Sequence, residues 1–396
     1  MQNEKPLSFE DTSIAFSSKT NEDLEKMHFL FSTMNWKYPT KIGTFFIKTA
    51  LKFKLPVQSV IKKTLFTQFC GGETIGECKN TIADLMKFNV RTILDYSVEG
   101  LDSDENFDNT MDKVLESIEA ASSSSAIAAG VFKMSGIGPA HILEKIQNGE
   151  ILTGDESMAL DNTKRRAEII CRMAYEKGVS VFIDAEESWI QGTIDAMVFD
   201  LMKLYNREKA IVFNTFQMYR ADMPYNLEKA FELASSAQFF LGIKLVRGAY
   251  MDKERKMAAM KNYESPIFSS KQETDEAYDE ALQFCAKNIN KISICAGTHN
   301  EKSNYLLPYL MLKHEIEKND PRVSFAQLYG MSDHISYNLA AAGYNVAKYL
   351  PFGPIDTVLP YLFRRAEENR AVTGTSAREL QLIKKEIKRR KKSKIV

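Results

Sequence analysis

Residues 163–185 read TKRRAEIICRMAYEKGVSVFIDA and hold, in one short stretch, the pattern that decides the fold. Apolar residues recur at helical spacing over residues 163–177, after Asp161-Asn162 and before Gly178, which predicts an amphipathic helix ended by a glycine. Residues 180–185 are a short β-branched and aromatic run, which is typical of a buried strand. A helix followed by such a strand is the repeating unit of an α/β fold with a parallel sheet.

The same alternation extends outward from this stretch in both directions. Further helical patterns occupy residues 227–237 and 273–288. Eight strands in alternation with helices is the number found in a closed parallel barrel, whereas doubly wound open sheets more often have fewer. We therefore predict a (β/α)8, TIM-like barrel of the α/β class. Its seven other strands are expected at residues 91–96, 126–134, 210–217, 240–246, 292–296, 323–328 and 345–350.

Three regions are expected along the chain. Residues 1–90 give helical patterns, such as 40–54 and 76–88, and no convincing strand, so we predict an N-terminal helical region. Residues 91–375 hold the strand and helix alternation and form the predicted barrel. Residues 376–396 are strongly basic and are predicted as a C-terminal tail.

Composition excludes several classes of protein. Lys and Arg total 52, as do Asp and Glu, so the zero net charge gives no nucleic-acid signature. The five cysteines are an odd number without a C-x-x-C pair, which favours free thiols in a reducing compartment. The histidines show no metal-ligand spacing, so no metal is expected. No apolar run or N-terminal signal stands out, and we expect a cytoplasmic location, with peripheral contact to the inner face of the membrane as an option.

Most predicted strands end in polar or charged residues. In a (β/α)8 barrel the active site lies at the carboxyl ends of the strands. Each polar strand end alone is weak support, because strands commonly lead into polar loops, but together they favour a catalytic site. These residues are Asp95, Lys133, Asp184, Gln217, Lys244, Arg247, Thr298, His299, Asn300, Gln327 and Tyr349.

The last predicted strand leads into a second informative stretch, YLPFGP at residues 349–354 and PYLFRRAEEN at residues 360–369. On a helix, Glu368 lies four residues after Arg364 and three after Arg365, so it can contact either guanidinium. Two arginines held by a carboxylate form a preorganised clamp for an anion. The alternative is a solvated helix face with ordinary ion pairs.

These motifs resemble those of the proline dehydrogenase family, both its single-function enzymes and the first domain of the bifunctional proline utilisation protein. The resemblance lies in YLPFGP and PYLFRRAEEN, together with KLVRGAY at 244–250, VFIDAE at 181–186, VFKM at 131–134 and GTHN at 297–300. Residues 93–100 and 69–74 are similar to the single-function branch. The resemblance covers residues 65–375 in the same order along the chain.

The resemblance implies roles for individual residues. Arg364, Arg365 and Lys133 would bind the proline carboxylate, and Glu368 would orient the arginines. Asp184 would balance the positive charge near Lys133, and Tyr349 would pack against the proline ring. The resemblance also implies an FAD cofactor, which would be contacted by Gln217, Lys244, Arg247, Gly248, Tyr250, Thr298, His299, Asn300 and Gln327. Lys244 departs from the family pattern, because bifunctional members have an arginine at this position.

The implied reaction is the first step of proline catabolism. Hydride transfer to flavin N5 would convert L-proline to 1-pyrroline-5-carboxylate, and the electrons would pass to a membrane quinone. In such an enzyme the protein positions the reactants while the cofactor performs the redox step.

The basic C-terminal run predicts adsorption to a membrane surface, because clustered lysines are attracted to anionic lipid. The run comprises Lys384, Lys385, Lys388, Arg389, Arg390, Lys391, Lys392 and Lys394. A frayed solvated tail and a nucleic-acid patch are the competing interpretations of the same residues.

Three other functions stay open at this point. The same barrel could act on hydroxyproline or another cyclic imino acid. A Schiff-base lyase or aldolase could use Lys133 or Lys244 as its nucleophile. A non-catalytic protein could use the basic tail to bind membranes.

Overall fold

The computed structural model describes residues 6–34, 62–98, 102–371 and 375–393. Within these ranges, the side chains of residues 62, 63, 363, 366–371, 375 and 376 are not described. The helix expected at residues 40–54 therefore lies outside the described residues.

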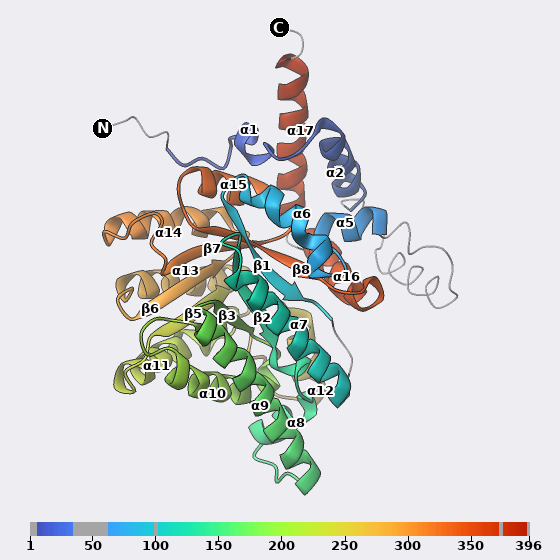
Figure 1. The fold of residues 1–396 in the computed structure, drawn as a ribbon. Helices are drawn as coiled ribbons and strands as arrows, with labels where there is room; N and C mark the ends of the chain where they lie inside the picture. Colours follow the sequence, from blue (N-terminus) through green and yellow to red (C-terminus); the bar gives the residue numbers. More distant parts are fainter. Residues whose placement is uncertain (1–5, 35–61, 99–101, 372–374, 394–396) are drawn as a thin grey trace. The chain divides into compact units, whose positions relative to one another are not determined.

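Eight strands form a closed barrel in the order β1 to β8, which confirms the predicted fold class (Figure 1). All the strand pairs from β2 to β7 are parallel. Each strand lies within two residues of its predicted bounds. The strands are β1 (Val90–Tyr96), β2 (Ile127–Lys133), β3 (Ser180–Asp184), β4 (Val212–Gln217), β5 (Leu241–Val246), β6 (Ile292–Gly297), β7 (Val323–Leu328) and β8 (Val346–Phe352).

Helices separate the strands, and the elements described before β1 are all helical. The helix predicted at 163–177 begins earlier, at Gly154, because Thr153 and Glu156 form a capping box that starts it. The helices are α1 (Thr12–Ala15), α2 (Asn21–Met34), α5 (Thr67–Phe69), α6 (Ile75–Met86), α7 (Asp104–Ser122), α8 (Ala140–Gln147), α9 (Gly154–Lys177), α10 (Ser188–Tyr205), α11 (Met223–Ser236), α12 (Met251–Lys261), α13 (Lys271–Lys287), α14 (Glu301–Lys313), α15 (Asp333–Ala341), α16 (Ile355–Ala371) and α17 (Thr375–Ser393), with short turns at Lys62–Phe66 and Met134–Gly136.

The register of the strands aligns the polar strand ends. Lys133 on β2 is opposite Asp184 on β3, and both are the last residues of their strands. Lys244 on β5 is opposite Thr215 on β4 and Cys295 on β6. Every residue of β4 is buried, as expected for a parallel sheet covered on both faces.

The chain divides into two compact units, and the three expected regions, with boundaries at residues 90 and 375, stay a prediction. The first unit comprises Met1–Thr92, Ser97–Glu99 and Gln327–Val396, and the second comprises Ile93–Tyr96 and Gly100–Ala326.

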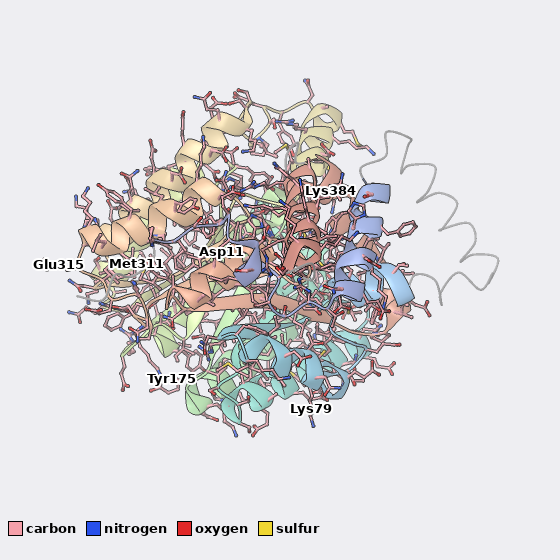
Figure 2. All side chains as sticks on the ribbon, turned by 90° about the horizontal axis from the view of Figure 1, so that it is seen from above. Asp11, Lys79, Tyr175, Met311, Glu315 and Lys384 are labelled. Carbon is pink, nitrogen blue, oxygen red and sulfur yellow. The ribbon has the colours of Figure 1, made fainter. Side chains whose placement is uncertain are left out.

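In the first unit, residues 376–393 of the stretch predicted as a basic tail belong to the helix α17, and residues 394–396, with Lys394, lie outside the described residues. Leu382 and Ile383 have no exposed surface and pack in one cluster with Phe16, Leu24 and Phe31. The outward side of α17 carries lysines, among them Lys384 (Figure 2). Burying this apolar face stabilises α17 as part of the fold, so it is not a frayed extension.

A buried charge cluster also ties α17 to the loop after β7. Lys348 is fully buried, with its Nζ 2.9 Å from Asp333 Oδ1, and Lys19 lies 3.8 Å from the other carboxylate oxygen. Burial opposes ionisation, but the two lysines hold the pKa of Asp333 below its usual value. Glu379 of α17 accepts a hydrogen bond from the Ser332 backbone N–H, and burial raises the pKa of Glu379 to about 8.

We predict that Glu379→Gln flattens the pH dependence of stability. The folded state keeps a proton that the unfolded chain releases near pH 4.5, the ordinary value for glutamate. Stability contributed by the neutral carboxyl is therefore present below pH 4.5 and is lost as the pH rises towards 8. The slope is at most about 1.4 kcal/mol per pH unit. Urea unfolding between pH 4.5 and 8 measures this slope. Glu280→Gln, which changes an exposed glutamate, is the control and should keep the wild-type slope. A wild-type slope in Glu379→Gln would contradict the prediction.

Gly248, just after β5, has a backbone that only glycine adopts without strain. Its φ is +128°, and a Cβ at this position would lie 2.5 Å from the ring carbons of Tyr219. The buried tyrosine has no open space to move into, since its side chain has no exposed surface.

We predict that Gly248→Ala lowers the free energy of unfolding by about 2–4 kcal/mol, the sum of backbone strain and overpacking. Gly154→Ala is the matched control, because no atom lies within 4 Å of its added Cβ and Gly154 is helical. That control should stay within about 1 kcal/mol of wild type or gain slightly. Chemical denaturation compares them, and equal losses in the two variants would refute the explanation.

Candidate active site

The centre of the candidate site in the second unit is an ion pair between β3 and β5. Lys244 Nζ lies 2.6 Å from Asp184 Oδ1, and their side chains are 7% and 20% exposed. Lys133 ends the neighbouring strand β2 opposite Asp184 in register, so a second lysine occupies the adjacent strand end. A carboxylate so placed compensates positive charge in a region largely shielded from water.

A second network joins the loops that follow β2, β3 and β4. Glu186 is buried and accepts hydrogen bonds from the Ser135 N–H, at 2.9 Å, and from the Ser135 hydroxyl. Burial raises the pKa of Glu186. Gln217, at the end of β4, donates from Nε2 to the backbone oxygen of Glu186 at 2.7 Å. The network fixes the loop directly after Lys133.

Arg247 is held by several partners beyond the end of β5. Its Nε donates to Asp275 Oδ1 at 2.6 Å, and its two terminal nitrogens donate to Thr298 Oγ1 at 2.7 Å and Ser303 Oγ at 3.0 Å. The guanidinium also lies 4.3 Å from the centre of the Tyr278 ring. These contacts place a fixed positive group beside the first turn of α14.

Thr298, His299 and Asn300 form the turn that starts α14. The Asn300 side chain accepts from the Ser303 N–H at 3.2 Å and caps the helix. Thr298 is buried, and its hydroxyl also accepts from the Asn300 N–H at 3.1 Å. His299 is partly exposed between them. The helix N-terminus and Arg247 together form an electropositive corner suited to an anionic group.

Two more expected cofactor residues lie after β5. The backbone at Gly248 passes directly over the Tyr219 ring. Tyr250 is partly exposed and is the residue that precedes the first turn of α12. Both residues therefore lie in the short segment that connects β5 to α12.

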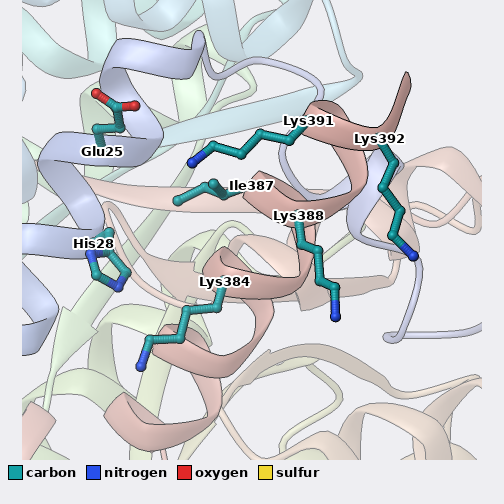
Figure 3. A pocket seen from close by; sticks show the side chains of 7 residues that line it. All are labelled: Glu25, His28, Lys384, Ile387, Lys388, Lys391 and Lys392. Atoms are coloured by element: carbon teal, nitrogen blue, oxygen red, sulfur yellow. The ribbon is translucent and has the colours of Figure 1, made fainter. Parts of the chain in front are cut away.

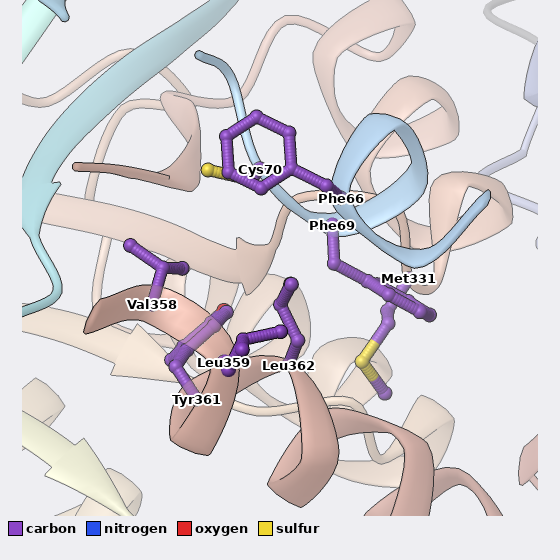
Figure 4. Close-up of a cluster of buried hydrophobic side chains, with 8 residues drawn as sticks. All are labelled: Phe66, Phe69, Cys70, Met331, Val358, Leu359, Tyr361 and Leu362. Carbon is purple, nitrogen blue, oxygen red and sulfur yellow. The ribbon is translucent and has the colours of Figure 1, made fainter. Parts of the chain in front are cut away.

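The arginine helix α16 belongs to the first unit and is anchored there by an apolar cluster. Val358 and Leu362 have no exposed surface and pack with Phe66, Phe69 and Met331 (Figure 4). The cluster therefore fixes the rotation of α16 about its own axis.

The two arginines of α16 differ in burial. Arg365 lies three and four residues after Leu362 and Tyr361, on the packed face, and is 8% exposed. Its guanidinium lies 4.9 Å from the centre of the Tyr361 ring. Arg364, one position earlier, is only partly buried. Glu368 lies on α16, but its side chain is outside the described residues.

Tyr349 and Gln327 complete the expected residues of the first unit. Tyr349 on β8 is 5% exposed, and its backbone oxygen accepts from the Tyr329 N–H at 2.8 Å. Gln327 on β7 is 2% exposed, and its side-chain oxygen accepts from the Ser336 hydroxyl at 2.8 Å.

Within the second unit, the structure joins Asp184 with Lys244, and Arg247 with Thr298, and it adds residues that the sequence analysis did not single out. Glu186, Asp275 and Ser303 fix the expected residues in place. Glu186 had a sequence signal, because it follows Asp184 by two residues just beyond a strand. Asp275 and Ser303 had none, since each lies within a charged or polar helix start.

The described residues offer neither a metal site nor a membrane span. They contain no group of three or more His, Cys, Asp or Glu side chains arranged to hold a metal ion. None of their helices combines the length and apolar content needed to cross a bilayer.

Comparison with known proteins agrees with the fold and motifs. The family model for proline dehydrogenase matches residues 78–378. The chain is 32% identical to "Proline dehydrogenase 1, mitochondrial" of Dictyostelium discoideum, over 96% of this chain and 74% of the relative. It is 37% identical to the "Hydroxyproline dehydrogenase" of Xenopus laevis, over 60% of this chain and 52% of that protein.

A solved structure shows the same fold. Proline utilization A (PutA) from Bdellovibrio bacteriovorus, inactivated by N-propargylglycine, matches 93% of this chain with a TM-score of 0.71 and 20% identity. The chain spans 40% of that longer protein. With the family match over most of its length and a closed eight-stranded parallel barrel, the chain belongs to the proline dehydrogenase family.

Proposed function

We propose that the chain oxidises L-proline to 1-pyrroline-5-carboxylate with FAD as its cofactor. The observation that carries the proposal is the charged end of the barrel strands, where the Lys244–Asp184 pair and the Arg247 network lie within a family match over residues 78–378. Bound FAD would supply the acceptor for the hydride that leaves the proline ring. The residues of this chain bind and orient the two molecules.

The donor set of the second unit fits FAD. Arg247 and the N-terminus of α14 offer N–H donors suited to a pyrophosphate. Lys244 offers an ammonium that Asp184 holds in place, suited to the flavin ring. We assign Gln217, Gly248, Tyr250, Thr298, His299, Asn300 and Gln327 to the remaining cofactor contacts.

For the substrate, we assign carboxylate binding to Arg364, Arg365 and Lys133. A carboxylate taken out of water needs close cations to offset its lost hydration. Asp184 would limit the local excess of positive charge, Glu368 would orient the arginines, and Tyr349 would pack on the ring. Holding proline in one orientation is the catalytic contribution of this set.

The electron acceptor and the location follow as parts of the same proposal. A membrane quinone would take the electrons, which requires the enzyme to reach a membrane surface. The cytoplasmic location expected from the sequence stays a prediction, whereas the Dictyostelium relative is named mitochondrial.

A second candidate, oxidation of hydroxyproline, is favoured by the similarity to the Xenopus protein. A tyrosine at position 349 supports plain proline, since it leaves less room for a hydroxyl on the ring. Equal or faster flavin reduction by hydroxyproline than by proline would select this candidate.

We predict a flavin absorption band in the purified protein that bleaches when L-proline is added without oxygen. Reduction of the flavin by the substrate removes the oxidised band, so one spectrum tests cofactor and reaction together. D-Proline is the control, because its carboxylate points to the other face of the ring. A colourless protein, or a band that L-proline leaves unchanged, would reject the proposed function.

We also predict that Arg365→Ala raises the KM for proline at least about tenfold while flavin remains bound. A charge-assisted hydrogen bond to a carboxylate contributes about 1.5–3 kcal/mol, which corresponds to roughly 10–150-fold. Arg172→Ala, on the exposed side of α9, is the control and should keep the wild-type KM. Unchanged proline saturation in Arg365→Ala would remove this arginine from the carboxylate site.

A further inference from the structure

A basic groove lies between α2 and α17 in the first unit (Figure 3). Its volume is about 470 Å³. None of the residues assigned to substrate or cofactor lines it. Its lining residues are Glu25 and His28 from α2, and Lys384, Ile387, Lys388, Lys391 and Lys392 from α17.

The cations of α17 fall into two sets. Arg378 and Lys385 pair with Glu10, and Arg389 and Arg390 each lie 2.7 Å from Glu386. These pairs neutralise part of the basic run and hold the helix in the fold. The second set is the four lysines that line the groove, which are exposed and have no carboxylate within ion-pair distance in the described part of the chain.

The groove therefore concentrates positive charge. Four ammonium groups line it against a single carboxylate, that of Glu25. Lysine keeps its charge strongly hydrated and mobile on a long stem, which suits shallow contact with anions at a surface. A buried, rigid anion site would instead favour arginine forks.

An exposed aromatic side chain borders this basic surface. Phe29 is 70% exposed on α2 and lies one helical turn after Glu25, a lining residue of the groove, although Phe29 itself does not line it. Ile387 adds an apolar side chain within the groove itself. A free phosphate ion or a nucleic-acid backbone offers no apolar surface to contact Phe29 and Ile387. A lipid interface contacts both positively charged and apolar side chains.

We infer that the surface formed by α2 and α17 binds anionic lipid headgroups at a membrane, with the four lysines on the phosphates and Phe29 entering the interface. Its link to electron transfer rests on the proposed function, because it would hold the enzyme at the membrane that contains the quinone. Lipid binding itself requires no turnover and is measured separately.

The test uses the full chain and vesicles of phosphatidylcholine with or without about 30 mol% phosphatidylglycerol, sedimented at low and high salt. The variant K384Q/K388Q/K391Q/K392Q should bind the anionic vesicles on the order of 100- to 1000-fold more weakly, since each lysine near the surface contributes about a fivefold factor. Phe29→Gln should weaken binding about tenfold even at high salt, because its contribution is apolar.

The matched control is K79Q/K164Q/K302Q/K313Q, which removes the same charge from exposed lysines elsewhere; Lys79 and Lys384 are labelled in Figure 2. Vesicle binding close to wild type in this control supports the inference, and an equal loss in both quadruple variants overturns it. Displacement by inorganic phosphate at constant ionic strength, or equally tight binding of duplex DNA, would also overturn it. Proline-dependent flavin reduction without vesicles should be the same in all variants, so a failure of the proposed function would show separately.

Discussion

Parallel hydrogen bonding between neighbouring strands is the constraint on which the rest of the structure depends. It aligns the strand register, so Lys133 and Asp184 end adjacent strands side by side. Parallel strands also require crossover connections, and the helices in these connections cover the sheet, which leaves little tolerance for an uncompensated charge within the strands. β3 illustrates the result, with three buried apolar residues, Val181, Phe182 and Ile183, and a carboxylate only at its last position. Charged groups available for chemistry are therefore concentrated at the strand ends and in the loops beyond them.

Compensation of buried charge then decides how the strand ends are organised. Lys244 lies within β5 and is tolerated there because Asp184 reaches it from β3. Arg247 is matched by Asp275 and two hydroxyls, and Glu186 by the N–H and hydroxyl of Ser135. In each case the partners come from a different segment of the chain, so the same contacts that neutralise charge also hold these segments together. A site built this way is rigid before any ligand binds.

The sequence predicted the barrel well because its strands are short, β-rich and regularly separated, so all eight fall close to their expected positions. It also identified Asp184, Lys244 and Arg247 as polar residues at or near strand ends. Their partners were harder to predict. Asp275 lies 28 residues from Arg247 in the sequence, and nothing in the charged start of α13 distinguishes it from its neighbours. Pairing across loops depends on three-dimensional proximity, which a pattern in one dimension does not encode.

The helices α16 and α17 give a second example of what the sequence did not predict, namely which basic residues are buried and which are exposed. In sequence, the arginines of α16 and the lysines of α17 are both clusters of positive charge. What separates them is their position relative to the apolar stripe of each helix. Arg365 shares the stripe of Tyr361 and Leu362 and is buried, whereas Lys384 and Lys388 lie off the stripe of Leu382 and Ile383 and are exposed. Arginine tolerates burial through its delocalised charge and planar contacts, and lysine favours hydrated surfaces. The helical phase thus buries Arg365 and leaves the lysines Lys384 and Lys388 in the solvent, although both helices carry basic clusters.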